Sequence, residues 1–201
     1  LPELDALFGV PQPPEHHPEI DTGVHTLMVL AQATRLSPDA RVRCAALLHD
    51  LGKGTTPASE WPKHIGHEER GAALVRDICG RLRVPNDYRD LAVLVARYHT
   101  HCHRAAELRD VTLLETIEAL DAFRRRERVE GFVRACEADF RGRTGYEERP
   151  YPQADIFRQA YLAARAVDTA AVANGRSGPQ VGEAIRLARI DAIRQARVVR
   201  D

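Results

Sequence analysis

Apolar side chains recur at intervals of three and four residues through most of the chain, which is the spacing of one face of an α-helix. In the first such segment Val24, Leu27 and Ala31 follow this spacing, and the pattern ends near Pro38. Further helices are predicted over residues 39–51, 66–83, 87–103, 111–125, 127–140, 153–167 and 179–198. The chain has no period-2 alternation typical of strands and no internal repeat. The pattern therefore predicts an all-α fold, a bundle of about seven or eight helices.

The positions of prolines, glycines and histidines predict how the chain is divided. Residues 1–20 are rich in proline and are expected to form a lead-in segment, and two loops rich in glycine and proline follow the second and sixth predicted helices. All nine histidines precede residue 141. We therefore expect a domain over 21–140 that carries the chemistry, and a C-terminal helical annex over 141–201.

Composition narrows the classes of function. No apolar run approaches the roughly 20 residues that span a bilayer, so we expect no membrane association. The N-terminal residues lack the pattern of a signal peptide, which favours a cytoplasmic protein. The net charge is zero and gives no overall signal for nucleic acid. Four scattered cysteines form no CxxC pair and are expected to be reduced. The only lysines, Lys53 and Lys63, lie in one short segment.

The string ALLHDLGKG carries the first candidate site. His49 and Asp50 end an apolar helix immediately before a turn bounded by glycines. An imidazole nitrogen and a carboxylate oxygen side by side offer two kinds of ligand to one divalent ion. A His-Asp dipeptide is common by chance, but its place at the end of an apolar helix predicts that both side chains point into a cleft.

Other histidines lie at helical spacing around this pair. They are His25, His64, His67, His99 and His103. His99 and His103 are four residues apart and are predicted to share a helical face, and His64 and His67, three apart, share one if that stretch is helical. His101 lies roughly opposite and is interpreted as an exposed residue. Together with His49 and Asp50, the set favours a metal site.

Two later aspartates compete for the place of a distal carboxylate. Asp121 lies within an apolar helical stretch, where a carboxylate is costly unless it is paired or bound to metal. Asp139 precedes an arginine-rich loop and is interpreted as pairing with arginine or supporting substrate. We therefore predict Asp121 as the metal ligand.

The order of a histidine, a His-Asp pair and a distant aspartate resembles the HD superfamily of metal-dependent phosphohydrolases. The chain resembles more closely the C-terminal half of the bacterial multifunctional CCA family, tRNA nucleotidyltransferases that carry an HD domain. The strings that carry this resemblance are LPELDALFGVPQPPEHHPEIDTGVHTL, HDLGKG, HIGH, LRVPNDYRDLA, DAFRRRERVE and EADFRGRTGYE. The nucleotidyltransferase motif is absent from these residues, so this chain is not expected to add CCA by itself.

The resemblance implies a metal-dependent 2′,3′-cyclic phosphodiesterase, 2′-nucleotidase and phosphatase, within a protein that repairs the tRNA 3′ end. The metal ligands carried over by motif are His25, His49, Asp50 and Asp121, and a second metal is expected at His67, His99 and His103. Nickel is favoured for the phosphatase activity, with magnesium, manganese or cobalt as alternatives.

The same interpretation assigns roles to residues around the metal. Asp50 and Lys53 are the predicted catalytic residues, Asp50 as a bridging ligand and Lys53 as a cation beside the phosphoryl charge. The substrate is predicted to contact a wider set, namely Lys53, His64, Arg124, Arg141 and Arg143. The expected substrates are 2′,3′-cyclic nucleotides and 2′-nucleotides, with the tRNA 3′ end reached through the full-length protein.

Two alternatives belong to other classes. Arginines near aromatic residues in RGRTGYEER and AFRRRERVE favour a tRNA-binding or self-association module with a vestigial metal site. A general nucleotide monophosphate phosphatase would share the site and differ in substrate. The chain is expected to be a monomer or a homodimer.

Overall fold

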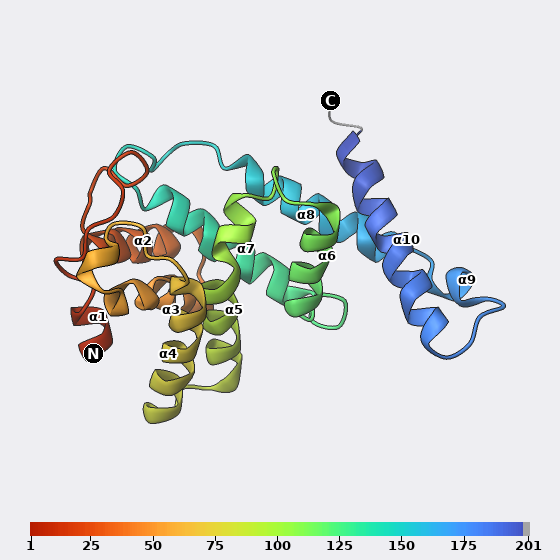
Figure 1. Ribbon diagram of the computed structural model, residues 1–201, viewed down its shortest axis with the longest axis horizontal. Coiled ribbons are helices and arrows are strands. Elements are labelled where there is room, and N and C mark those ends of the chain that lie inside the picture. The colour runs from red at the N-terminus through yellow and green to blue at the C-terminus, as the bar shows by residue number, and fades with distance from the viewer. Residues whose placement is uncertain (199–201) are drawn as a thin grey trace.

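Helices make up most of the computed structural model, which describes residues 1–198 (Figure 1). The longer helices are α2 (Thr22–Leu36), α3 (Ala40–Leu48), α4 (His67–Arg81), α5 (Asn86–His103), α6 (Asp110–Ala119), α7 (Glu127–Arg141), α8 (Pro152–Ala166) and α10 (Pro179–Val198). Short elements are α1 (Pro2–Asp5), α9 (Thr169–Ala173) and two 3₁₀ turns, η1 (Leu51–Thr55) and η2 (Ala58–Glu60). Within residues 1–198 the one extended pairing is an isolated bridge between Pro11 and Asp21. The all-α prediction is confirmed.

Aspartate caps fix where two of the site-bearing helices begin. The Asp21 carboxylate accepts a hydrogen bond from the backbone N–H of Val24 at the start of α2. Asp39 does the same for Arg41 at the start of α3, at 2.8 Å. Each cap satisfies a backbone donor that the first turn of a helix leaves without an intrahelical partner. These caps set the register that brings His25 and His49 to the interior.

Helix α6 is shorter than the predicted segment 111–125, because Asp121 adopts a left-handed backbone conformation (φ 54°). The Asp121 N–H donates to the Glu118 carbonyl and the Ala122 N–H donates to the Ile117 carbonyl. This pair of hydrogen bonds is a Schellman motif, with Asp121 in the position that glycine usually takes. Asp121 therefore ends a helix instead of lying within one.

The core forms where α5 and α7 cross the other helices. Helix α5 packs against α3, α4, α7 and α8, while α2 packs against α3 and α7. Fully buried Phe132 of α7 and Phe157 of α8 lie with ring centroids 5.4 Å apart. This packing places the end of α3, the start of α4, the last turns of α5 and α7, and the interior face of α2 around one point.

Both ends of the chain contribute to this core. Leu7, in the predicted lead-in, is fully buried, as are Phe157 and Ala164 in the predicted annex. Helix α10 lies at the opposite end of the molecule from the N-terminus (Figure 1). The annex residues 199–201 lie outside the described part of the chain. None of the helices in residues 1–198 combines the length and apolarity needed to cross a membrane.

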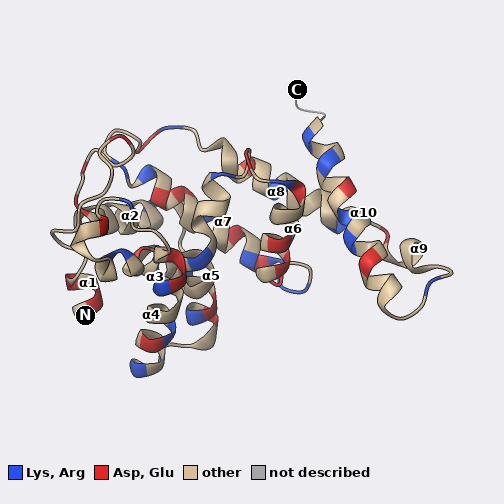
Figure 2. Cartoon of the chain, in the orientation of Figure 1, with Lys and Arg blue, Asp and Glu red and all other residues tan. Residues whose placement is uncertain are grey.

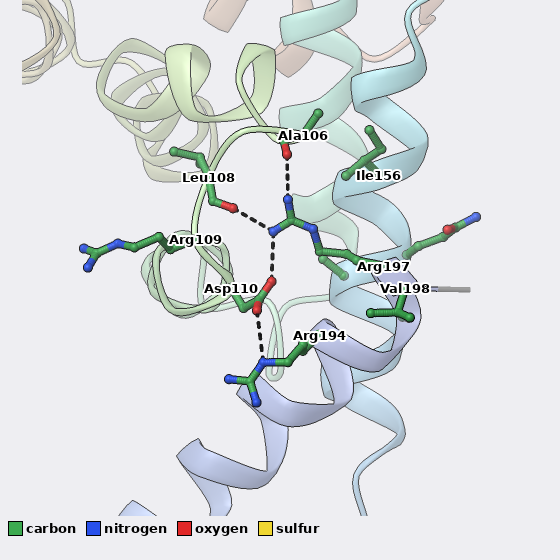
Figure 3. A pocket seen from close by; sticks show the side chains of 11 residues that line it. Ala106, Leu108, Arg109, Asp110, Ile156, Arg194, Arg197 and Val198 are labelled. Carbon is green, nitrogen blue, oxygen red and sulfur yellow. Dashed lines mark hydrogen bonds and ion pairs between the residues drawn. The ribbon is translucent and has the colours of Figure 1, made fainter. Parts of the chain in front are cut away.

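Helix α10 is anchored by the guanidinium of Arg197 (Figure 3). Its nitrogens donate to the carbonyl oxygens of Leu108 and Ala106, each at 2.6 Å, and to Asp110 at 2.8 Å. The cavity beside it has a volume of about 570 Å³. The Arg197 guanidinium is thus bound by Asp110 and two carbonyl oxygens, and none of the residues that line this cavity is a histidine.

Candidate metal centre

His49 and Asp50 lie at the end of α3, where the chain turns into η1, and both side chains are buried. The His49 Nδ1–H donates to the carbonyl of Ala46 at 2.7 Å, so its Nε2 is free to act as an electron-pair donor. That Nε2 lies 3.2 Å from Asp50 Oδ2. The predicted pair therefore does point inward, and a backbone carbonyl fixes the orientation of the imidazole.

Asp139, near the end of α7, meets this pair from the opposite side. Its Oδ1 lies 3.1 Å from His25 Nε2 and 3.6 Å from His49 Nε2. His25 projects from α2 and is fully buried. Donor atoms of His25, His49 and Asp139 all lie within 4.8 Å of one another, close enough to share one ion. Three helices far apart in sequence thus supply one donor set.

A second donor set uses the other oxygen of Asp50. Asp50 Oδ1 lies 3.5 Å from Nε2 of His67, at the start of α4, and 3.6 Å from Nε2 of His99, in α5. The Nδ1 atoms of these rings donate to the carbonyls of His64 and Val95. Asp50 therefore faces His49 with one oxygen and His67 and His99 with the other, as a carboxylate that bridges two ions would.

His103 lies beside Asp139 rather than in the second set. Its Nε2 is 2.6 Å from Asp139 Oδ2, and its Nδ1 is hydrogen-bonded to the hydroxyl of Tyr151 at 2.8 Å. Tyr151 immediately precedes α8, so the predicted annex also contributes to the site. The sequence indicated His103 but gave no signal for this tyrosine.

The donor atoms fit a divalent ion. His49 Nε2, Asp50 Oδ1 and His67 Nε2 are buried and have no hydrogen-bond partner among the described residues. Buried polar atoms are otherwise nearly always paired, so this group of three indicates a ligand. Imidazole nitrogens and carboxylate oxygens suit zinc, iron, nickel, cobalt or manganese. Metal-ligating histidines almost always donate their other N–H to a carbonyl or carboxylate, as these do.

The electrostatics of the cluster also favour a cation. Burial opposes ionisation of Asp50, but His49 and Lys53 hold its pKa well below the usual range. Burial likewise opposes ionisation of Asp139, whose pKa His103 and His49 keep low. Burial would lower the pKa of His49, yet Asp50 and Asp139 raise it to about 10. Two ionised carboxylates therefore converge on a site that demands positive charge.

A pocket of about 170 Å³ is lined by Asp50, His67 and His99 of the second donor set and by Asp139 of the first. Its basic residues are Lys53, Lys63 and Arg143, which include both lysines of the chain. The buried Lys53 ammonium lies 2.6 Å from Asp50 Oδ2 and donates to Gln12 Oε1 at 2.6 Å. His64 also lines the pocket, and its Nε2–H donates to the carbonyl of Pro11. The pocket is therefore suited to a small anion.

The structure does not bring Asp121 into the metal centre, and this prediction is corrected. Its carboxylate is 35% exposed and pairs with Arg125 and Arg124 behind the end of α6. The apolar neighbours Leu120 and Ala122 are buried, but the left-handed backbone of Asp121 at the end of α6 directs its carboxylate outward. Asp139 takes the place of the distal carboxylate, because it pairs with His25, His49 and His103 instead of with the arginine that was expected.

Of the arginines predicted to bind substrate, one lines the pocket and two do not. Arg143 lines the pocket, whereas the Arg124 side chain is 85% exposed beside Asp121. Arg141 pairs with Glu137 at 2.9 Å and does not line the pocket. His101 is half-buried and hydrogen-bonded to Thr116, so its interpretation as an exposed residue is also corrected.

His17 and Glu19, in the segment predicted as a lead-in, were missed. Glu19 Oε1 lies 2.8 Å from His25 Nδ1 and 3.1 Å from His17 Nδ1. Burial lowers the pKa of His17 to about 4, so its imidazole is neutral at pH 7. The signal that could have found them is a histidine doublet between prolines, a few residues before His25.

Comparison with known proteins matches residues 22–134 to the family described as HD domain. A multifunctional CCA protein of Thioalkalivibrio sulfidiphilus is 60% identical over 97% of this chain and 48% of its own length. A relative with the same description in Teredinibacter turnerae is 55% identical over 96% of this chain and 47% of its own. The chain thus spans about half the length of these curated relatives. No solved structure matches significantly.

Proposed function

Because the chain belongs to the HD-domain family, we propose that it is a metal-dependent phosphohydrolase acting as 2′,3′-cyclic phosphodiesterase, 2′-nucleotidase and phosphatase. The observation that carries the proposal is a group of buried donor atoms without hydrogen-bond partners on His49, Asp50 and His67, of which Asp50 and His67 line a basic pocket. Imidazole, carboxylate and ammonium groups in one small pocket are the groups that hydrolysis of a phosphate ester requires.

The chain offers two neighbouring positions for metal. His25, His49, Asp50 and Asp139 would hold one ion, and Asp50 with His67 and His99 would hold a second. A bound divalent ion supplies Lewis acidity, which lowers the pKa of a coordinated water and offsets charge on the phosphoryl oxygens. Backbone carbonyls hold the rings of His49, His67 and His99, so the donor atoms need little reorganisation on binding.

The basic residues of the pocket would bind the phosphoryl group. Lys53 is held by Asp50 and Gln12 with its ammonium beside the metal donors, where it can stabilise charge that develops in the transition state. Lys63 and Arg143 line the same pocket and can hold the non-bridging oxygens. Lys53 is therefore assigned to catalysis, and Lys63 and Arg143 to substrate binding.

The size of the pocket limits what it can enclose. A volume of about 170 Å³ lies below the roughly 300–1,000 Å³ of sites that enclose a whole drug-sized ligand. The phosphate and part of a ribose can enter, while the base remains outside. We therefore propose that base identity affects the rate little.

The donor set leaves several metals open, and the HD resemblance favours nickel, with magnesium, manganese or cobalt as alternatives. The test is the initial rate of phosphate release from 2′-AMP, 3′-AMP and 5′-AMP under identical conditions with each metal. Opening of 2′,3′-cyclic AMP is followed separately by its monoester product. The proposal expects 2′-AMP to be hydrolysed fastest, and a clear preference for 5′-AMP would indicate a general nucleotidase instead.

We further propose that this chain is the HD half of a protein that adds or repairs the CCA end of tRNA. The arginines after α7 favour RNA contact as a second function. Arg149 stacks on Tyr146 with its guanidinium carbon 3.9 Å from the ring centroid. Elsewhere acidic and basic residues are mixed along the helices (Figure 2). If the surface binds RNA, Arg149→Ala should weaken tRNA binding in a filter assay without changing hydrolysis of 2′-AMP.

A further inference from the structure

His17 is held in one orientation beside the metal centre by Glu19. The Glu19 side chain is 3% exposed, and its Oε1 is hydrogen-bonded to His17 Nδ1 at 3.1 Å. Its Oε2 accepts the backbone N–H of Thr144, in the loop after α7, at 3.1 Å. The His17 and His25 rings meet edge to face, with centroids 4.7 Å apart. The lead-in segment is therefore fixed against both α2 and the loop after α7.

This arrangement determines which hydrogen bond the free nitrogen of His17 can make. A carboxylate accepts and cannot donate, so the single proton of the neutral imidazole must lie on Nδ1. Nε2 then carries a lone pair and acts as an acceptor. No residue within 1–198 is paired with this Nε2, and the ring lines the pocket that contains Asp50 and Asp139.

Asp50, Asp139, His67, His99 and His103 belong to the metal centre, and the Thr100 hydroxyl donates to Glu68. The remaining polar groups of the pocket differ from His17 in what they can bind. Lys53, Lys63 and Arg143 only donate, and they suit phosphoryl oxygens. His64 Nε2–H donates to Pro11, and its Nδ1 is enclosed by protein and inaccessible to a ligand. His17, whose side chain keeps 11% exposure, thus presents an acceptor that a hydroxyl group can reach.

We propose that His17, oriented by Glu19, accepts a hydrogen bond from a hydroxyl group next to a phosphate monoester, so that the enzyme prefers monoesters with a neighbouring hydroxyl to monoesters without one. This inference rests on the proposed phosphohydrolase function and names its substrate class. In a pocket this small, the hydroxyl within reach of His17 is the one on the adjacent carbon, as in a ribose 2′-phosphate with a free 3′-hydroxyl. Glu19 is a positioning residue, and His17 is the specificity-determining residue.

The experiment compares 2′-AMP with 3′-deoxyadenosine 2′-phosphate, which lacks the neighbouring hydroxyl. Loss of one hydrogen bond of about 1–1.5 kcal/mol lowers kcat/KM by about tenfold, so the wild-type enzyme should prefer 2′-AMP by about that factor. His17→Ala should bring the ratio close to one, chiefly by lowering the rate with 2′-AMP. His17→Gln, whose amide oxygen can accept, should retain part of the preference.

Matched controls separate the possible failures. His16→Ala alters an exposed histidine next to His17 and should keep the wild-type ratio. Metal content and inhibition by inorganic phosphate should stay at wild-type levels in His17→Ala, because His17 serves the hydroxyl and not the phosphate. An unchanged ratio in both His17 variants overturns the inference while the proposed function stands. Absence of phosphate release from every substrate by the metal-loaded wild type overturns both.

Discussion

At the residue scale, the structure and the sequence-based prediction differ in the distal carboxylate: the sequence favoured Asp121, whereas Asp139 lies beside the histidines. Asp139→Asn removes a negative charge that His25, His49 and His103 all face, so bound metal and phosphate release should fall at least tenfold. Asp121→Asn changes a half-exposed residue at the end of α6, and asparagine also tolerates a left-handed backbone. Metal analysis and initial rates of both variants test the assignment. Loss of metal from Asp121→Asn alone would restore the earlier choice.

Single residues also show why the histidines were predicted as candidates and Asp139 was not predicted as a metal ligand. His25, His67, His99 and His103 lie on helices and could be recognised from helical spacing. His64 precedes α4 in a left-handed backbone conformation (φ 48°), so it shares no helical face with His67. The choice between Asp121 and Asp139 depended on helix α7 passing beside α2, a contact between residues 114 positions apart. Apolar neighbours were a poor guide, since they describe the face of a helix and not the direction of a side chain at its end.

At the element scale, the turn η1 must pass unusually close to the start of α4. A Cβ atom on Gly52 would collide with the backbone carbonyl of His67 and lie 2.7 Å from the Gly71 nitrogen. Gly52→Ala should therefore push apart Asp50 and His67, cost about 1–3 kcal/mol of stability, and weaken metal binding. The check is chemical denaturation together with a metal titration.

The matched control for this prediction is Gly80, a glycine that lies within α4 itself. A Cβ atom there meets nothing within 4 Å, and the residue has helical geometry. Gly80→Ala should stabilise the protein by about 0.5–1 kcal/mol and leave metal binding unchanged. Equal effects of the two alanines would show that the close approach of η1 and α4 has no special importance.

Most element positions were predictable, and the exceptions have physical causes. Strongly periodic segments such as residues 22–36 were found because apolar residues follow helical spacing and Pro38 marks the end of the pattern. The end of α6 was missed because aspartate, unlike glycine, gives little signal for a left-handed residue. The role of residues 1–20 was missed because a proline-rich segment without periodicity gives no indication that Leu7 and His17 pack inward.

At the scale of the whole molecule, the metal-free protein should be most stable near pH 6.5. Burial lowers the pKa of His99 to about 3 and of His17 to about 4, so the stability that these neutral rings contribute is complete above about 6.5 and is lost as the pH falls. The pKa of His49 is raised to about 10, so its contribution is present below about 6.5 and is lost as the pH rises toward 10.

Melting temperatures of chelator-treated protein between pH 4 and 10 measure this dependence. His17→Gln should make the acid side of the curve shallower, whereas His16→Gln should not alter it. Added metal should flatten the alkaline side, because the ion takes over the charge that the His49 proton supplies in its absence. Stability that rises steadily from pH 6.5 to 10 without metal would contradict this account of the cluster.

The central claim is that a metal held by the His49–Asp50 pair performs phosphate ester hydrolysis. The most direct measurement follows phosphate release from 2′-AMP by chelator-treated wild type and His49→Ala, each before and after nickel is added back, with bound metal counted in the same samples. The account predicts that wild type is inactive without metal and recovers with it, while folded His49→Ala binds less metal and stays inactive. Full activity of His49→Ala, or of the chelated wild type, would contradict it.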